Sequence, residues 1–268
     1  MSLQKRAPTA IVLLVLLFAA VQWAPPLVFF LVIQGVAALS LAEFYSLARR
    51  RNLKPQRAAG LVAALVLAVP FYVRSVPTAL AVFGALFFLG AYYLAYARTL
   101  ERIAAVPASM AVTAFGALYI GFTLNFLVLV RAERGPAYLY FFFAVIFLGD
   151  TGAYLIGKLL GRHKMSPLIS PKKTWEGCIG GLIFAGLGAA AARELLLAAV
   201  PLGAAVVCGL AVHTVAQMSD PLESLFKRAA GVKDSSNLLP GHGGFLDRVD
   251  SLLLAGPVFY FWILYLWK

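Results

Sequence analysis

Long apolar runs separated by short clusters of charge most limit what this chain can fold into. Of its 268 residues, 62% are hydrophobic and only 13% are charged. A helix needs roughly 20 apolar residues to cross the hydrocarbon core of a bilayer. Lipid-exposed backbone must also satisfy its own hydrogen bonds, which leaves helices or closed barrels. Because the runs are unbroken and do not alternate, they predict an all-α, polytopic bundle of transmembrane helices.

The apolar runs divide the chain into nine predicted spans. They cover approximately residues 8–23, 26–48, 58–73, 76–97, 107–130, 137–160, 175–192, 195–217 and 249–267. The first span is short and follows Lys5 and Arg6, so a cleaved signal peptide is the alternative for it. We expect residues 1–130 to form an N-terminal region of about five spans. Residues 131–268 are then the catalytic region.

The distribution of Lys and Arg predicts the orientation. With a cytoplasmic N-terminus and an external C-terminus, 18 of the 23 basic residues fall in cytoplasmic segments and five outside. This division follows the positive-inside rule and places residues 161–174 and 218–248 in the cytoplasm. The net charge of +12 is therefore explained by topology and by attraction to anionic lipid, not by nucleic-acid binding. We expect a multi-pass protein of the cell (inner) membrane whose active site faces the cytoplasm.

Acidic residues gather between residues 217 and 250. Five of the eleven in the chain lie there: Asp220, Glu223, Asp234, Asp247 and Asp250. If the eighth span continues as a helix, Asp220 shares a face with Ser224 and Lys227. Asp247 and Asp250 share a face at the start of the last span. Carboxylates on two helix ends predict a site for Mg²⁺, which keeps positions open for phosphate oxygens.

The same segment carries groups suited to phosphate. Its basic residues are Lys227, Arg228, Lys233 and Arg248, and His242 lies in the run P-G-H-G-G, which ends with Gly243 and Gly244. Glycines let the backbone approach a ligand, and successive N–H groups can form an anion-binding nest. Acids for a metal and bases for phosphate together indicate phosphoryl or nucleotidyl transfer. The alternative is an ordinary charged cytoplasmic loop.

A second polar segment, S-P-K-K-T-W-E-G, precedes the seventh span. Its Lys172 and Lys173 are candidates for holding a triphosphate or a lipid phosphate, with Glu176 at the helix start. The alternative is local: Ser170 or Thr174 caps the helix, and Glu176 favours the helix dipole. The two roles are compatible.

Three ionisable residues lie inside predicted spans and away from the span ends. Asp150 occurs in F-L-G-D-T-G-A-Y, His213 lies one turn before Gln217, and Glu43 is in the second span. An acid within a membrane segment by default marks a function or an interior pair. We expect Asp150 to belong to the active-site cavity. For His213 a hydrogen bond across helices is an equal alternative, and for Glu43 the simplest reading is a pair with a nearby arginine such as Arg49.

The run S-L-F-K-R-A-A-G-V-K-D-S-S-N-L-L-P-G-H-G-G-F-L-D-R-V-D, residues 224–250, resembles the signature of the phosphatidate cytidylyltransferase (CDP-diglyceride synthase) family. The resemblance extends upstream through S-P-K-K-T-W-E-G and G-D-T-G-A-Y, and so covers the C-terminal half. It implies a dimeric, Mg²⁺-dependent membrane enzyme. Its substrates would be CTP and phosphatidic acid, and its products CDP-diacylglycerol and pyrophosphate.

The resemblance also implies roles for individual residues. Asp220 and Asp247 would be the metal-associated acids, with Asp250 beside them. The other catalytic positions would be Lys227, Arg228, Lys233, Asp234, His242 and Arg248. The expected substrate-binding residues are Asp150, Ser170, Lys172, Lys173, Glu176, Ser224, Gly243 and Gly244. The chain departs from the family pattern at Ser219, where the family has glycine, and at Pro221, which we expect to bend the helix.

Two other functions use similar residues. A CTP-dependent lipid kinase would direct the same groups at the γ-phosphorus. An ion- or proton-coupled transporter would explain Asp150 and His213 within spans, but it predicts midplane sites and an internal repeat. A CDP-alcohol phosphatidyltransferase would carry an acidic D-G-x-x-A-R motif, which this sequence lacks.

Overall fold

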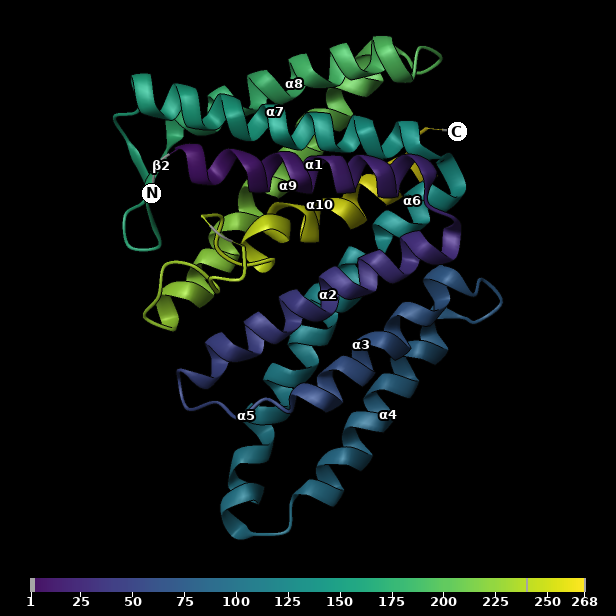
Figure 1. Cartoon of the computed structure of the whole chain (residues 1–268), viewed down its shortest axis with the longest axis vertical. Helices are drawn as coiled ribbons and strands as arrows, with labels where there is room; N and C mark the ends of the chain where they lie inside the picture. The colour runs from purple at the N-terminus through teal and green to yellow at the C-terminus, as the bar shows by residue number, and fades with distance from the viewer. Residues whose placement is uncertain (1–2, 240, 268) are drawn as a thin grey trace. The chain divides into compact units, whose positions relative to one another are not determined.

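The computed structural model describes residues 3–239 and 241–267, with side chains from Ala10 onward. These residues are mostly helical (Figure 1). They form two compact units. Unit 1 contains Met1–Leu129 and Phe226–Val249, and unit 2 contains Val130–Leu225 and Asp250–Lys268. The segment between residues 226 and 249 therefore folds with the first half of the chain.

Unit 1 is built from the N-terminal helices. They are α1 (Leu3–Trp23), α2 (Pro26–Arg49), α3 (Arg57–Tyr72), α4 (Thr78–Tyr96), α5 (Leu100–Gly116) and the π-helical turn η1 (Ala117–Phe122). Pro26 at the first position of α2 has no N–H to leave unsatisfied. Within the unit, α3 packs against α4 and η1, and α2 contacts α3 and α5. The buried Tyr45 hydroxyl donates to the carbonyl of Thr113 at 2.6 Å, which ties α2 to α5.

Unit 2 is dominated by a helical hairpin. Its elements include α6 (Phe126–Arg134, which starts in unit 1), α7 (Pro136–Leu160), β1 (Lys164–Ser166), β2 (Ser170–Thr174) and α8 (Trp175–Leu196). Helices α7 and α8 pack along their lengths (Figure 1). Gly157 and Gly177 face each other there, where a side chain on either would meet the opposite helix or the Thr174 hydroxyl. Strands β1 and β2 form an antiparallel hairpin between the helices.

Two helices contribute residues to both units. Helix α9 (Leu202–Ala229) enters unit 1 at Phe226, and α10 (Leu246–Tyr265) leaves it after Val249. The signature loop, residues 230–245, joins them. The predicted loop 218–248 is thus helical as far as Ala229. Helix α9 also starts later than predicted, because Pro201 disfavours helical conformation in the residue before it.

The predicted helical membrane protein is confirmed in outline. Six described helices are long and apolar enough to span a bilayer: Pro26–Arg49, Thr78–Tyr96, Leu100–Arg134, Pro136–Leu160, Trp175–Leu196 and Leu202–Ala229. The count of nine spans and the orientation of the termini stay predictions. One local detail was not foreseen: the segment 161–174 contains a β-hairpin. Helix α9 continues through Pro221 to Ala229, as the predicted shared face of Asp220, Ser224 and Lys227 requires.

Candidate active site

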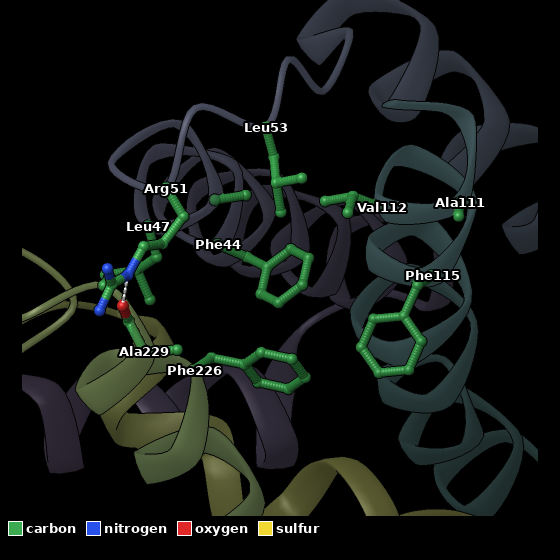
Figure 2. A pocket seen from close by; sticks show the side chains of 11 residues that line it. Phe44, Leu47, Arg51, Leu53, Ala111, Val112, Phe115, Phe226 and Ala229 are labelled. Atoms are coloured by element: carbon green, nitrogen blue, oxygen red, sulfur yellow. Dashed lines mark hydrogen bonds between the residues drawn. The ribbon is translucent and has the colours of Figure 1, made fainter. Parts of the chain in front are cut away.

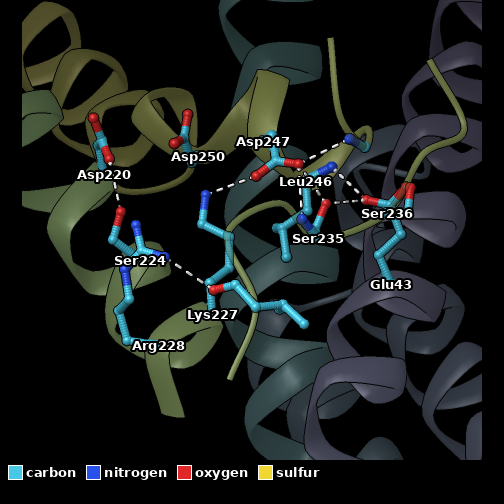
Figure 3. Close-up of polar contacts among 12 residues, drawn as sticks. Glu43, Asp220, Ser224, Lys227, Arg228, Ser235, Ser236, Leu246, Asp247 and Asp250 are labelled. Atoms are coloured by element: carbon cyan, nitrogen blue, oxygen red, sulfur yellow. Dashed lines mark hydrogen bonds and ion pairs between the residues drawn. The ribbon is translucent and has the colours of Figure 1, made fainter. Parts of the chain in front are cut away.

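A buried ion pair lies at the centre of the polar cluster in unit 1. Lys227 is in the last turn of α9, and Asp247 is in the first turn of α10. The Lys227 Nζ lies 2.7 Å from Asp247 Oδ1, and the two side chains are only 10% and 6% exposed (Figure 3). Removing one partner of such a pair leaves a buried, uncompensated charge. The structure thus pairs two residues, Lys227 and Asp247, that were predicted from the sequence to be catalytic.

The second oxygen of Asp247 holds the signature loop. Asp247 Oδ2 accepts hydrogen bonds from the Ser235 backbone N–H at 2.9 Å, the Ser235 hydroxyl at 2.8 Å and the Gly244 N–H at 2.8 Å. Burial alone would raise the pKa of the Asp247 carboxyl, but the Lys227 ammonium and these donors outweigh it and hold that pKa below its usual value. Asp247 is therefore an ionised anchor for the loop.

Glu43 is a site residue whose role the sequence did not predict. Its side chain, on α2, accepts from the Ser236 hydroxyl at 2.7 Å. The Ser235 hydroxyl lies 2.9 Å from Glu43 Oε2 and shares its one proton between Glu43 and Asp247 (Figure 3). Glu43 also accepts from the N–H groups of Phe245 at 3.1 Å and Leu246 at 2.8 Å. The last two donors lie at the start of α10, where helical N–H groups lack partners within the helix. Glu43 thus caps α10 from another helix.

The pairing of Glu43 with Arg49 was a wrong prediction. Arg49 donates instead to the carbonyl of Pro55, and Glu43, only 4% exposed, faces the signature loop. The one sequence feature that could have indicated this role of Glu43 was the acidic residue itself, because a carboxylate in an apolar span needs hydrogen-bond donors nearby. The sequence indicates that such donors exist but does not say which residues supply them.

The two glycines of the signature loop have different reasons to be glycine. Gly243 has φ +78°, in the left-handed region that other residues rarely adopt. Gly244 has no room for a side chain, because a Cβ there would collide with the Ser235 hydroxyl and the Glu43 carboxylate. The N–H of His242 bonds to the Leu239 carbonyl, and that of Gly244 to Asp247. These two N–H groups stabilise the loop itself. Pro240, in the predicted anion-binding run, lies outside the described residues.

The remaining predicted residues of unit 1 surround this cluster. Arg228, Lys233, Asp234 and Arg248 are exposed, and His242 is half-buried. Arg228 donates to the Val232 carbonyl at 3.1 Å, which stabilises the turn that follows α9. The exposed cations around the buried Lys227–Asp247 pair can bind an anionic ligand while they remain partly solvated, so binding does not require every charge to lose its water.

Unit 2 contains a second ion pair between predicted site residues. Lys173 Nζ, on β2, lies 2.8 Å from Asp220 Oδ2, on α9, with side chains 27% and 39% exposed. The Ser224 hydroxyl donates to Asp220 Oδ1 at 3.3 Å (Figure 3), which confirms that these two residues share a helix face. Lys172, the neighbouring lysine, is exposed. Asp220 is thus more accessible than Asp247.

The capping role predicted as the alternative for the segment 170–177 is confirmed for Thr174. Its hydroxyl accepts from the Gly177 N–H at 3.1 Å at the start of α8. Glu176 accepts from the Arg162 N–H at 3.1 Å and contacts His163 Nδ1 at 2.5 Å. Glu176 therefore holds the end of α7 against the start of α8. Ser170 is half-buried at the start of β2.

The other predicted residues of unit 2 lie on three helices. Asp150, on α7, is exposed at the surface of the described chain. Asp250, on α10, accepts from the Ser251 N–H at 2.8 Å, and its carbonyl accepts from the Ser219 hydroxyl. His213, on α9, is fully buried and packs against Gly149 and Gly181. The glycines make room for the imidazole ring, so His213 has a clear packing role.

The two predicted metal-binding acids differ in how well they fit a cation. Among the described residues, no group of three or more His, Cys, Asp or Glu side chains is placed to hold a metal ion. Asp220 fits a cation ligand, because its side chain is 39% exposed and the lysine with which it pairs, Lys173, is itself partly exposed. Asp247 does not fit one in this arrangement, because its side chain is only 6% exposed and its oxygens are already occupied by donors from Lys227, Ser235 and Gly244.

Comparison with known proteins gives the same family across nearly the whole chain. The model of the Cytidylyltransferase family matches residues 4–266. Proteins named phosphatidate cytidylyltransferase are 41% identical in Staphylococcus saprophyticus over 140 residues, 40% in Bacillus subtilis over 147 and 44% in Staphylococcus aureus over 142. These matches cover 52%, 54% and 52% of this chain and 54%, 55% and 54% of the relatives. The chain thus matches about half the length of these curated relatives.

Proposed function

Because the chain belongs to the cytidylyltransferase family, we propose that it transfers CMP from CTP to phosphatidic acid, giving CDP-diacylglycerol and pyrophosphate. The family match over residues 4–266 carries this proposal. The curated relatives name phosphatidate as the acceptor. The residues that the resemblance assigns to catalysis include the buried Lys227–Asp247 pair, which supports placing the chemistry around the signature loop.

The proposed reaction needs positioning and charge neutralisation more than a strong base. A phosphate oxygen of phosphatidic acid attacks the α-phosphorus of CTP, and a new P–O bond forms. The bond from the α-phosphorus to the bridging oxygen breaks, and pyrophosphate leaves with that electron pair. Because the attacking phosphate is already ionised at neutral pH, with a second pKa of about 6, no proton must be removed first. The barrier then falls mainly through orientation and electrostatics.

The exposed cations are the groups that we assign to the phosphates. In unit 1 they are Arg228, Lys233 and Arg248, and in unit 2 the exposed cation is Lys172. Lys173, which is half-buried and paired with Asp220, is assigned to the phosphates as well. Arginine binds phosphate through a planar fork of N–H groups, and lysine acts as a point charge. Asp247 and Glu43 act indirectly, since they hold the loop from which Lys233 and His242 project.

We also propose that the reaction requires Mg²⁺, with Asp220 as the residue best placed to bind it. When bound, Mg²⁺ would neutralise charge on the phosphate oxygens. A metal-binding role for Asp247 would require Lys227 to give up its ion pair with Asp247. In the proposal, the main role of Asp247 is therefore to hold the signature loop in place through its hydrogen bonds. We further propose, on the resemblance and the charge distribution, a homodimer in the inner membrane with its active site in the cytoplasm.

Labelled CTP tests the proposed reaction directly. The purified protein is incubated with phosphatidic acid, Mg²⁺ and CTP labelled at either the α- or the γ-phosphate. Transfer of α-label to lipid, with γ-label appearing as pyrophosphate, is the expected result. A lipid kinase gives the reverse: γ-label enters lipid and α-label remains in soluble CDP. That outcome, or transfer that continues after chelation of divalent ions, contradicts the corresponding part of the proposal.

A further inference from the structure

An apolar pocket of about 290 Å³ lies within unit 1 (Figure 2). Its walls come from α2, α5 and the end of α9, and three phenylalanines, Phe44, Phe115 and Phe226, dominate it. Phe44 and Phe226 meet edge to face with ring centroids 5.2 Å apart. Apart from Arg51, every lining side chain is apolar. The pocket therefore suits a hydrocarbon group and offers almost nothing to a polar one.

The pocket wall and the buried ion pair share one turn of α9. Phe226 projects into the pocket (Figure 2), while Lys227, the next residue, pairs with Asp247. Arg51 lies at the pocket edge, where its Nε donates to the Ala229 carbonyl at the end of α9. A guanidinium carries five N–H donors, so Arg51 can bond to the helix end and to an anion together. Apolar space, a cation and the catalytic segment are thus adjacent.

We propose that this pocket binds part of one acyl chain of phosphatidic acid, with Arg51 facing the anionic headgroup. The inference rests on the proposed function and adds a specificity site to it. A volume of about 290 Å³ is at the lower end of the roughly 300–1,000 Å³ of small-molecule pockets, so the pocket takes a portion of one chain and not both. Because the acyl chain reaches the pocket from bilayer hydrocarbon and not from water, its preference for the pocket comes from close packing against the three phenylalanine rings.

Filling the pocket tests the inference. Ala111 lines it from α5, so Ala111→Phe should exclude part of the chain. Phe115→Ala should enlarge the pocket and remove apolar contacts. Ala91→Phe, at an exposed position of α4 outside the lining, is the matched control. CDP-lipid formation is measured with dihexanoyl and dioleoyl phosphatidic acid, and KM for each lipid is expressed relative to the unsubstituted protein.

We expect Ala111→Phe to raise KM for the dioleoyl lipid severalfold, because the added ring fills space that the proposal assigns to the acyl chain. KM for the dihexanoyl lipid should change less than about twofold, and Ala91→Phe should alter neither. If Phe115→Ala changes KM for the two lipids by the same factor, the inference is wrong. This variant also decides the test if Ala111→Phe is inactive on both lipids. Absence of any CDP-lipid from the unsubstituted protein would instead refute the proposed function.

Discussion

At the scale of single residues, Glu43 and Asp247 together determine the conformation of the signature loop. Glu43 accepts hydrogen bonds from the Ser236 hydroxyl and from two backbone N–H groups, and it shares the Ser235 hydroxyl proton with Asp247. Glu43→Gln keeps the shape but leaves one oxygen as an acceptor, so buried donors lose partners at about 1–3 kcal/mol each. We expect a lower melting temperature and a kcat reduced by on the order of tenfold or more.

The control for Glu43→Gln is Glu101→Gln. Glu101 is 82% exposed and pairs with Lys54 at 2.9 Å, and exposed pairs contribute about 0–1 kcal/mol. Both melting temperature and activity should stay near those of the unsubstituted protein. Equal effects of the two substitutions would show that Glu43 has no special part in holding the loop. A Glu43→Asp variant that restores the melting temperature but not kcat would separate stability from positioning.

The depressed pKa of Asp247 gives a test by pH. Because the folded-state pKa of this carboxyl is lowered, its contribution to stability is complete above its unfolded pKa of about 3.9. That contribution is lost as the pH falls through the lower folded value. The difference in melting temperature between the unsubstituted protein and Asp247→Asn should therefore be large near neutral pH and shrink below about pH 4. A difference that is constant across this range contradicts the role of the ionised form.

At the scale of elements, the β-hairpin and the start of α8 place two adjacent lysines differently. Lys173 pairs with Asp220, whereas Lys172 is exposed. Each lysine replaced by Gln should raise KM for CTP or phosphatidic acid, because a charge contact made in the ground state is lost. Only Lys173→Gln should also change the Mg²⁺ concentration needed for half-maximal activity, since it alters the charge beside Asp220.

The matched pair of variants makes this prediction decisive. Unchanged KM values in both would leave Thr174 capping and the Glu176 contacts as the only roles of this segment. Equal shifts in Mg²⁺ requirement would show that the Lys173–Asp220 ion pair does not influence the metal. Thr174→Ala is a useful reference, because loss of the cap should destabilise by about 1 kcal/mol without a specific effect on Mg²⁺.

At the scale of the whole molecule, the orientation predicted from the 18 and five basic residues awaits a test. Single cysteines at Asn237, in the signature loop, and Ser75, between α3 and α4, suit it because both positions are exposed. They are introduced in a variant in which the free Cys178 and Cys208 are replaced. A membrane-impermeant thiol reagent should label them from opposite sides. Labelling of both from the same side contradicts the nine-span topology.

The sequence by itself determined the helices and the chemical character of the site. The span predicted at 26–48 is α2, and the span predicted at 137–160 is α7, because apolar runs and flanking prolines act on neighbouring residues only. The signature residues predicted the family, and residues 4–266 match its model. The shared face of Asp220 and Ser224 followed from helical spacing alone.

Only the tertiary structure decided which polar groups meet. Glu43 and Ser235 are separated by 192 positions in the sequence, yet Glu43 Oε2 lies 2.9 Å from the Ser235 hydroxyl oxygen. No local sequence pattern links the two residues. Asp247 carries the same carboxylate as Asp220 and was assigned the same metal. In the structure it is buried and bonded to Lys227, Ser235 and Gly244, whereas Asp220 stays accessible. The type of a side chain determines what it can bond to, but packing determines which donors reach it, and that depends on contacts between distant segments.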